Sequence, residues 1–182
     1  MSDNETPIPH APAFYACSAA TPDGPPIEIA WATPGLEKFG LTCDSRLIRP
    51  AAAWIPELAR DVKALQPYGL ALSDLQDFGT SPRELAARMN EVLVDRELFS
   101  ATAADDARIR KIFDAAHSAP AFALRRTDAE DLITELAQML RLPQRKIARA
   151  KRKAEAMCLI GVRAEAKVSF LAMYWNFVAA GN

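Results

Sequence analysis

Five cations recur on one face of the segment that follows Pro143. On an α-helix beginning there, successive residues turn by about 100°. The five side chains then fall within an arc of roughly 120°; they are Arg145, Lys146, Arg149, Arg152 and Lys153. Such a face attracts phosphate backbones, with an affinity that falls as salt rises because counterions are released. Arginines near the start of the helix can also bond to guanine edges in a major groove.

The charge of the chain is unevenly distributed. Residues 1–140 carry 13 basic and 21 acidic side chains, a net charge of −8, whereas residues 141–182 carry 9 basic and 2 acidic ones, a net charge of +7. This asymmetry indicates an anionic partner. The alternative is that the two parts attract each other within the fold or across a dimer.

Two helices are expected to position the basic face. The run Thr127-Asp128-Ala129-Glu130 is a capping box that begins a helix reaching Leu140. A break at Arg141-Leu142-Pro143 separates it from the basic helix. On that second helix the side opposite the cations is apolar, with Ile147, Ala150, Ala154 and Met157, so we expect it to be buried.

Two helices joined by a three-residue turn, the second of them basic, resemble a helix-turn-helix. The apolar residues that hold the two helices together in that family match Leu136, Ala137, Leu140, Leu142, Ile147 and Ala150. The continuation over 154–163 is similar to a recognition helix that passes into the first wing strand of bacterial winged helix-turn-helix regulators. The resemblance covers roughly residues 104–178. It implies helices over 104–116, 127–140 and 143–157, and a β-hairpin formed by 159–163 and 168–178.

This resemblance implies sequence-specific binding of double-stranded DNA and transcriptional regulation by a homodimer. Base and backbone contacts would come from the recognition helix over 143–157, and phosphate contacts from the wing. The DNA-binding residues implied are Gln144, Arg145, Lys146, Arg149, Arg152, Lys153, Arg163 and Lys167.

Three positions depart from the family pattern. Arg141 and Cys158 stand where the family commonly has glycine, and a left-handed backbone is costly for both. The wing turn at 164–167 lacks glycine, asparagine and proline and has helical propensity.

The alternative is one long helix over 144–180. Apolar residues from Ile147 to Val178 advance by threes and fours, as a buried seam would. In that case the chain would be a non-catalytic helical subunit or adaptor, with the basic face docked on an acidic partner.

The rest of the chain is expected to be mainly α-helical. Six of the 13 prolines lie in residues 1–26, which predicts a disordered arm with a small apolar island at 14–17. Residues 27–31 alternate as a short strand would. A small helical region over 27–101, suited to oligomerisation or to a protein partner, contains a well-capped helix that begins at Ser81-Pro82. The helix-turn-helix domain would occupy 102–182. The predicted fold class is therefore mainly α, with a C-terminal winged helix-turn-helix and one short β-hairpin.

Enzyme signatures are absent from the sequence. It has no glycine-rich phosphate loop, no GxSxG, no HExxH and no paired Cys/His arrangement, so we expect no catalysis and no cofactor. Asp105 and Asp106 are interpreted as first-turn helix residues, and His117 as a helix cap. Three widely spaced cysteines predict neither a disulfide nor a metal site. Without a signal peptide or a span of about 20 apolar residues, we expect a cytoplasmic protein.

Overall fold

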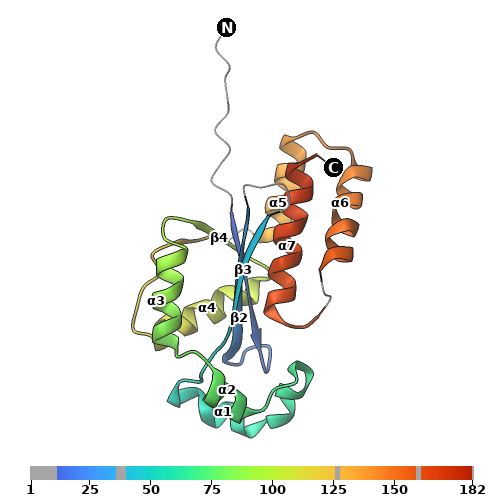
Figure 1. Cartoon of the computed structure of the whole chain (residues 1–182). Coiled ribbons are helices and arrows are strands. Elements are labelled where there is room, and N and C mark those ends of the chain that lie inside the picture. Colours follow the sequence, from blue (N-terminus) through green and yellow to red (C-terminus); the bar gives the residue numbers. More distant parts are fainter. Residues whose placement is uncertain (1–11, 36–39, 126–127, 159–160, 182) are drawn as a thin grey trace.

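The computed structural model describes residues 12–35, 40–125, 128–158 and 161–181. Within these ranges, five strands form one mixed sheet in the order β3-β2-β1-β4-β5 (Figure 1). The first three strands are antiparallel neighbours, and β4 and β5 run parallel to β1. Their bounds are Ala13–Ala19 for β1, Pro26–Pro34 for β2, Leu41–Leu47 for β3, Glu97–Ser100 for β4 and Ala123–Arg125 for β5.

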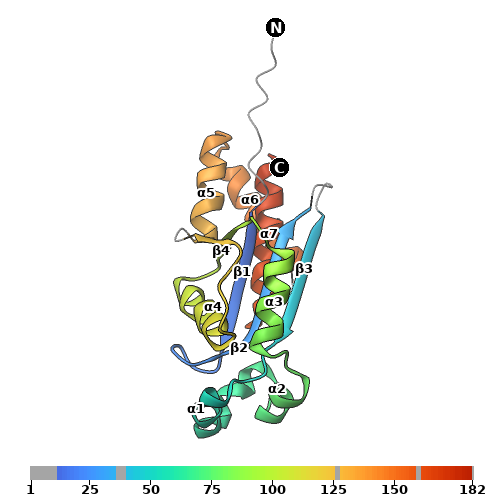
Figure 2. The same ribbon diagram turned by 90° about the vertical axis from the view of Figure 1, so that its left-hand side faces the viewer.

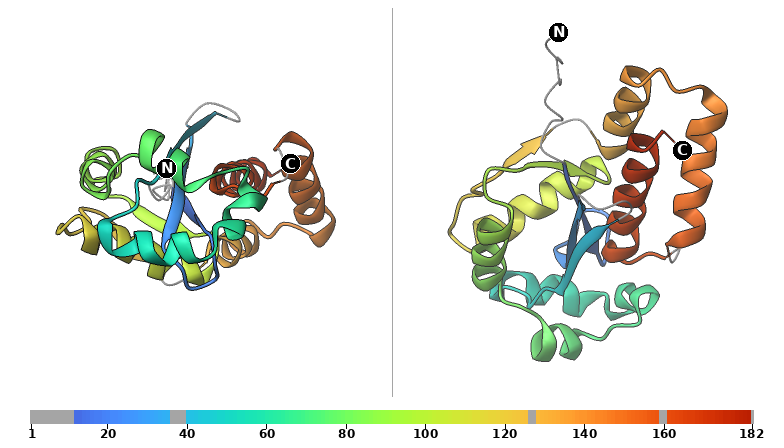
Figure 3. Two further views of the ribbon diagram at one scale, coloured as in Figure 1. Left: turned by 90° about the horizontal axis from the view of Figure 1, so that it is seen from below. Right: turned by 45° about the horizontal axis from the view of Figure 1, so that its top comes forward.

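Helices cover both faces of this sheet. On one face lie α3 (Pro82–Val92) and α4 (Ala103–Ala115). On the other lie α5 (Ala129–Met139) and α7 (Ala164–Ala179), and α6 (Gln144–Met157) packs on the outer side of α7 (Figures 1 and 3). At one end of the sheet is a group of short helices (Figure 2). These are η1 (Ala52–Trp54), α1 (Ile55–Arg60), η2 (Val62–Tyr68) and α2 (Leu72–Phe78).

The prediction of a mainly α fold is wrong, chiefly because of β1. Every residue of this strand is buried, and Tyr15 pairs with Trp31 on one side and with Ser100 on the other. A central strand covered on both faces reads as an uninterrupted apolar run, without the alternation of a half-exposed strand. The disordered arm expected over 1–26 therefore does not describe Ala13–Ala19, and residues 1–11 of that arm lie outside the described residues. The domain boundaries expected after residues 26 and 101 both fall within this one sheet, which contains strands from all three expected segments.

The predicted wing is wrong as well, because Ala164–Ala179 is the helix α7. Its apolar residues pack on the sheet and on α6, and Val168, Ala172 and Val178 are wholly buried. The Ala164–Lys167 segment has helical propensity, and it forms the first turn of α7, whose apolar residues pack on the sheet. Residues 159 and 160 of the expected first wing strand lie outside the described residues. The alternative of one long helix over 144–180 is wrong too, since α6 ends at Met157 and Cys158 has an extended backbone.

The helix pair around Pro143 is confirmed. Asp128 caps α5 by accepting a hydrogen bond from the amide of Asp131, and α6 begins directly after Pro143. Ala150 and Ala154 are buried as expected, whereas Met157 is 63% exposed. Arg141 does adopt a left-handed backbone, with φ of 52°. The capping box at the start of α3 is also confirmed, with reciprocal bonds between Ser81 and Glu84.

Candidate functional site

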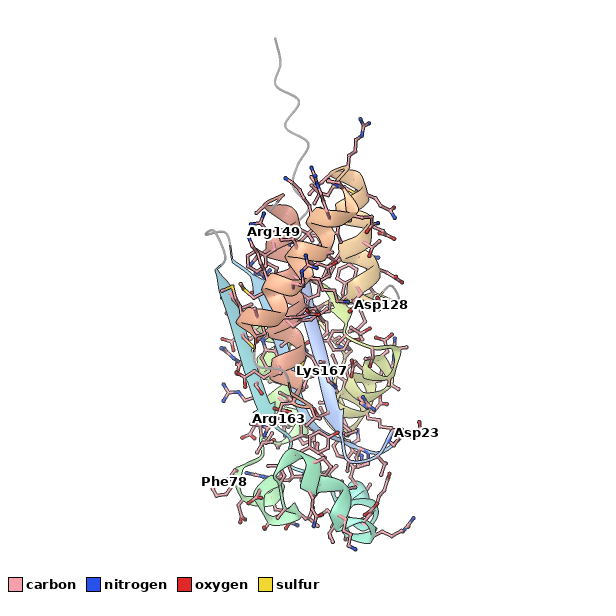
Figure 4. The ribbon with its side chains drawn as sticks, turned by 90° about the vertical axis from the view of Figure 1, so that its right-hand side faces the viewer. Asp23, Phe78, Asp128, Arg149, Arg163 and Lys167 are labelled. Carbon is pink, nitrogen blue, oxygen red and sulfur yellow. The ribbon has the colours of Figure 1, made fainter. Side chains whose placement is uncertain are left out.

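Three adjoining pockets meet at Lys167 in the first turn of α7. One of about 310 Å³ lies at the carboxyl end of β1 and is also lined by Arg108. A second of about 180 Å³ lies beside Thr102, at the start of α4. A third of about 330 Å³ lies between α5, α6 and α7 and shares Glu130 and Phe170 with the second. We call these pockets together the Lys167 groove. In Figure 4, Lys167 lies between Arg163 and Asp128.

The positive charge of Lys167 is uncompensated. Within the described part of the chain, its ammonium makes no hydrogen bond or salt bridge, and the side chain is half-buried. The neighbouring cations are paired: Arg163 with Glu28, Arg108 with Asp105, and Lys151 with Glu130. The ammonium of Lys167, where the three pockets meet, can therefore stabilise a carboxylate, sulfate or phosphate group, while Glu155 lines the far part of the largest of them.

Glu28 fixes the start of α7 and so the position of Lys167. This β2 carboxylate is 1% exposed and accepts hydrogen bonds from Nε of Arg163 at 2.9 Å and from the backbone amide of Ala164 at 3.0 Å. Ser45 also donates to it, at 3.1 Å. Burial raises the pKa of Glu28, but the bonds from Arg163 and Ala164 outweigh it, so the pKa is lowered. An ionised Glu28 thus caps a helix that is distant in sequence.

Two aspartates at the start of α4 are held by structural bonds. Asp105 is fully buried and accepts hydrogen bonds from the amides of Cys17 and Thr102, so its expected first-turn role is confirmed. Asp106 accepts a hydrogen bond from the hydroxyl of Tyr15. Burial, and then this bond, raise the pKa of Tyr15 well above its usual range. Among the described residues, no group of three His, Cys, Asp or Glu side chains is arranged to hold a metal ion.

An aromatic pair borders the groove. Phe170 lines two of the pockets and stacks on Tyr174, with ring centroids 5.8 Å apart and an interplanar angle of 27°. Both rings belong to α7, one helical turn apart. The half-buried Phe170 ring therefore offers an apolar surface within reach of Lys167 and Lys151.

The structure separates the DNA-binding residues expected from the sequence. Five of them are exposed on α6: Gln144, Arg145, Lys146, Arg149 and Arg152. Lys146 donates to the carbonyl of Gly181 at 2.7 Å, and Nζ of Lys153 lies 5.4 Å from the centroid of the Phe177 ring. Arg163 is paired with Glu28, and only Lys167 lies at the centre of the groove.

No family model matches the chain, and no curated protein matches its sequence. Solved structures of exonuclease I show a partial similarity of fold. The enzyme from E. coli, in complex with a dT13 oligonucleotide, is 15% identical with a TM-score of 0.46, over 67% of this chain and 29% of its own. A product-bound exonuclease I is 16% identical with a TM-score of 0.47, over 68% and 31%. The enzyme from Methylocaldum szegediense is 14% identical with a TM-score of 0.43, over 67% and 28%. This chain therefore spans less than a third of each of these proteins.

Several predictions need correction in view of these findings. A transcription regulator that reads DNA with α6 and a wing is contradicted, because the helix α7 occupies the place of the wing. The adaptor built on one long helix fails at the break after Met157. The exclusion of an enzyme is contradicted by the similarity to exonuclease I structures. The exclusion was based on the absence of motifs that belong to other folds, so it gave no information about an enzyme with this fold. In the described part of the chain, no helix is long and apolar enough to cross a membrane.

Sequence reasoning missed most of the groove. Glu28, Arg108 and Phe170 come from segments far apart in the chain, and each of them alone is an ordinary strand or helix residue. The interpretation of Lys167 as a phosphate contact depended on a wing that does not exist. An available signal was the IEIAW alternation over 27–31, which placed a lone glutamate among residues of a buried strand.

Proposed function

We propose that this protein binds a single strand of DNA in the Lys167 groove. The observation that carries the proposal is the uncompensated ammonium of Lys167 where three pockets meet. A nucleic-acid strand supplies anionic groups at regular spacing, so one phosphate can lie at Lys167 while its neighbours follow the groove.

The aromatic border of the groove favours a single strand over a duplex. Phe170 can stack on a base only if the base is unpaired, and such stacking is tolerant of sequence. The pocket of about 330 Å³ beside Phe170 is also of a size suited to a single nucleotide and not to a double helix.

The exposed cations of α6 support binding at longer range. Arg145, Arg149 and Arg152 are exposed on α6, and Figure 4 shows Arg149 on the same side of the molecule as Lys167. Such charges raise the rate of encounter with a polyanion more than they fix its position. In this proposal these arginines attract the DNA strand and do not recognise base edges.

Fluorescence anisotropy with a labelled oligodeoxythymidylate tests the proposal. We expect binding that weakens steeply between low and physiological salt. Lys167→Gln should weaken it by about tenfold, since a charge-assisted hydrogen bond contributes about 1.5 kcal/mol or more. Phe170→Ala should weaken it by a similar factor through lost stacking.

A matched control removes one exposed positive charge from the opposite face of the sheet. Arg83 lies on α3, so Arg83→Gln should leave the affinity nearly unchanged. Equal affinities of the wild type and Lys167→Gln would contradict the proposal.

Incubating the same oligonucleotide with Mg²⁺ and separating the products on a gel measures strand cleavage in parallel. The homodimer, the protein partner at the N-terminal region and the cytoplasmic location remain predictions.

A further inference from the structure

The pocket at the carboxyl end of β1 differs from the other two in chemistry. It is bounded by the β1–β2 connection and by Tyr68, and its charged lining residues are Arg108 and Lys167. The Tyr68 hydroxyl donates to the carbonyl of Ala19 at 2.8 Å. This hydrogen bond holds the end of η2 against β1 at this end of the groove. Ser18 and Thr21 also belong to the lining, and the Ser18 hydroxyl donates toward Glu28 and the Val162 carbonyl. The pocket is therefore polar, whereas the pocket beside Phe170 and Cys158 is mainly apolar.

Arg108 is held rigidly in the wall of this pocket. Its guanidinium donates to the carbonyls of Pro22 at 2.9 Å and Cys17 at 3.3 Å, and to the Asp105 carboxylate at 3.3 Å. Its Nε is buried and has no hydrogen-bond acceptor among the described residues. A planar guanidinium fixed in this way loses little conformational freedom when an anion arrives.

Lys167 supplies a second cation to the lining of the pocket. Burial, and then the charge of Asp105, raise the pKa of the Cys17 thiol, while the nearby charges of Arg108 and Lys167 oppose this rise. Asp105 compensates Arg108, and Arg163 compensates Glu28. The charge of Lys167 remains, so the pocket as a whole favours an anion.

We propose that this pocket binds the terminal phosphate of the strand, so that the protein recognises a phosphorylated DNA end. The inference rests on the proposed function and adds a preferred substrate to it. A phosphomonoester carries a charge of about −1.5 to −2 near neutral pH, compared with −1 for an internal phosphodiester. It also has three free acceptor oxygens, which suit the Lys167 ammonium and the remaining donor of the Arg108 guanidinium. The β1–β2 connection and Tyr68 bound the groove at this point, where a strand would end rather than continue.

The test compares three versions of one short labelled oligodeoxythymidylate: with a 5′-phosphate, with a 3′-phosphate, and with hydroxyl groups at both ends. We expect one phosphorylated form to bind about tenfold more tightly than the form with two hydroxyl groups. Lys167→Gln should abolish this preference. Lys151→Gln should weaken binding of all three forms by the same factor, because Lys151 lines only the apolar pocket. Circular dichroism confirms that each variant is folded.

Competition with inorganic phosphate tests whether the pocket binds a terminal phosphate or any phosphate of the strand. Inorganic phosphate should displace the phosphorylated oligonucleotide more readily than the one with two hydroxyl groups. Equal displacement of both would place an internal phosphate in the pocket and overturn the inference, as would a preference that survives in Lys167→Gln. If all three forms bind equally in a salt-dependent way, the inference fails and the proposed function stands. If none of them binds, the proposed function itself is wrong.

Discussion

Glu28 shows how one buried carboxylate can determine the position of a distant cation. It is 1% exposed, and the carboxylate accepts hydrogen bonds from Arg163 and from the first turn of α7. We expect Glu28→Gln to lower the free energy of unfolding by about 1.5–2 kcal/mol, because the variant weakens the charge-assisted hydrogen bonds from the 41% exposed Arg163 and from the Ala164 amide. Urea denaturation at neutral pH measures this loss. Glu97→Gln is the control, since the Glu97–Arg125 pair is about half-exposed and should contribute little.

The same residue predicts a pH dependence. The pKa of Glu28 is lower in the folded protein than in the unfolded chain, where it is about 4.3. Its stabilising effect is therefore complete above that value and is lost as the pH falls through the folded pKa. The difference in stability between the wild type and Glu28→Gln should shrink below about pH 4. A difference that stays constant from neutral to acidic pH would contradict this account.

Arg141 is a second residue with a measurable consequence. Its φ of 52° lies in the left-handed region, where a side chain costs about 1–2 kcal/mol that glycine avoids. Glycine also has more freedom in the unfolded chain, which offsets part of the gain. Arg141→Gly should therefore stabilise the protein by about 0.5–1 kcal/mol, seen as a rise of a few degrees in Tm. In contrast, Arg145→Gly in α6 should destabilise it by about 1 kcal/mol.

At the scale of elements, two small residues of α6 allow this helix to pack closely on α7. Ala150 and Ala154 are at most 1% exposed and belong to the core that includes α7, which requires close approach of the two helices. Ala154→Leu should overpack this contact and cost about 1–3 kcal/mol in unfolding free energy. Ala148→Leu, on the exposed side of the same helix, should change stability little. Equal effects of the two substitutions in thermal denaturation would mean that α6 does not pack on α7 in this way.

Helices were easier to predict than strands for a physical reason. The start of α3 and the α5–α6 pair are specified by local features: Ser81-Pro82, Asp128 and the Arg141–Pro143 break. In contrast, β1 depends on partners in β2 and β4 and on helices covering both faces, so its sequence carries no periodic signal. The α7 segment was misread because aromatic and β-branched residues suit a strand and a buried helix alike. The candidate groove could not be predicted, because it forms only where residues of α4 and α7, from opposite faces of the sheet, line one pocket at the end of β1.

At the scale of the whole molecule, the sheet makes a prediction about local stability. The residues of β1 are buried and hydrogen-bonded on both sides, whereas the α1–α2 region buries few side chains. We expect amides of Ala13–Ala19 to be among the slowest to exchange in hydrogen–deuterium exchange mass spectrometry, and those of α1 and α2 among the fastest. Rapid exchange throughout 13–19 would restore the hypothesis of a disordered arm.

The central position of β1 also bears on how the chain folds as it leaves the ribosome. Its antiparallel partner β2 follows within a few residues, but β4 emerges only after residue 97 and α7 only after residue 164. Until then, Phe14, Ala16 and their neighbours on β2 have no helix to cover them. The nascent hairpin exposes an apolar surface for most of translation, and such surfaces attract chaperones and favour aggregation. Folding yield during synthesis should therefore depend on α7, the element that also carries Lys167.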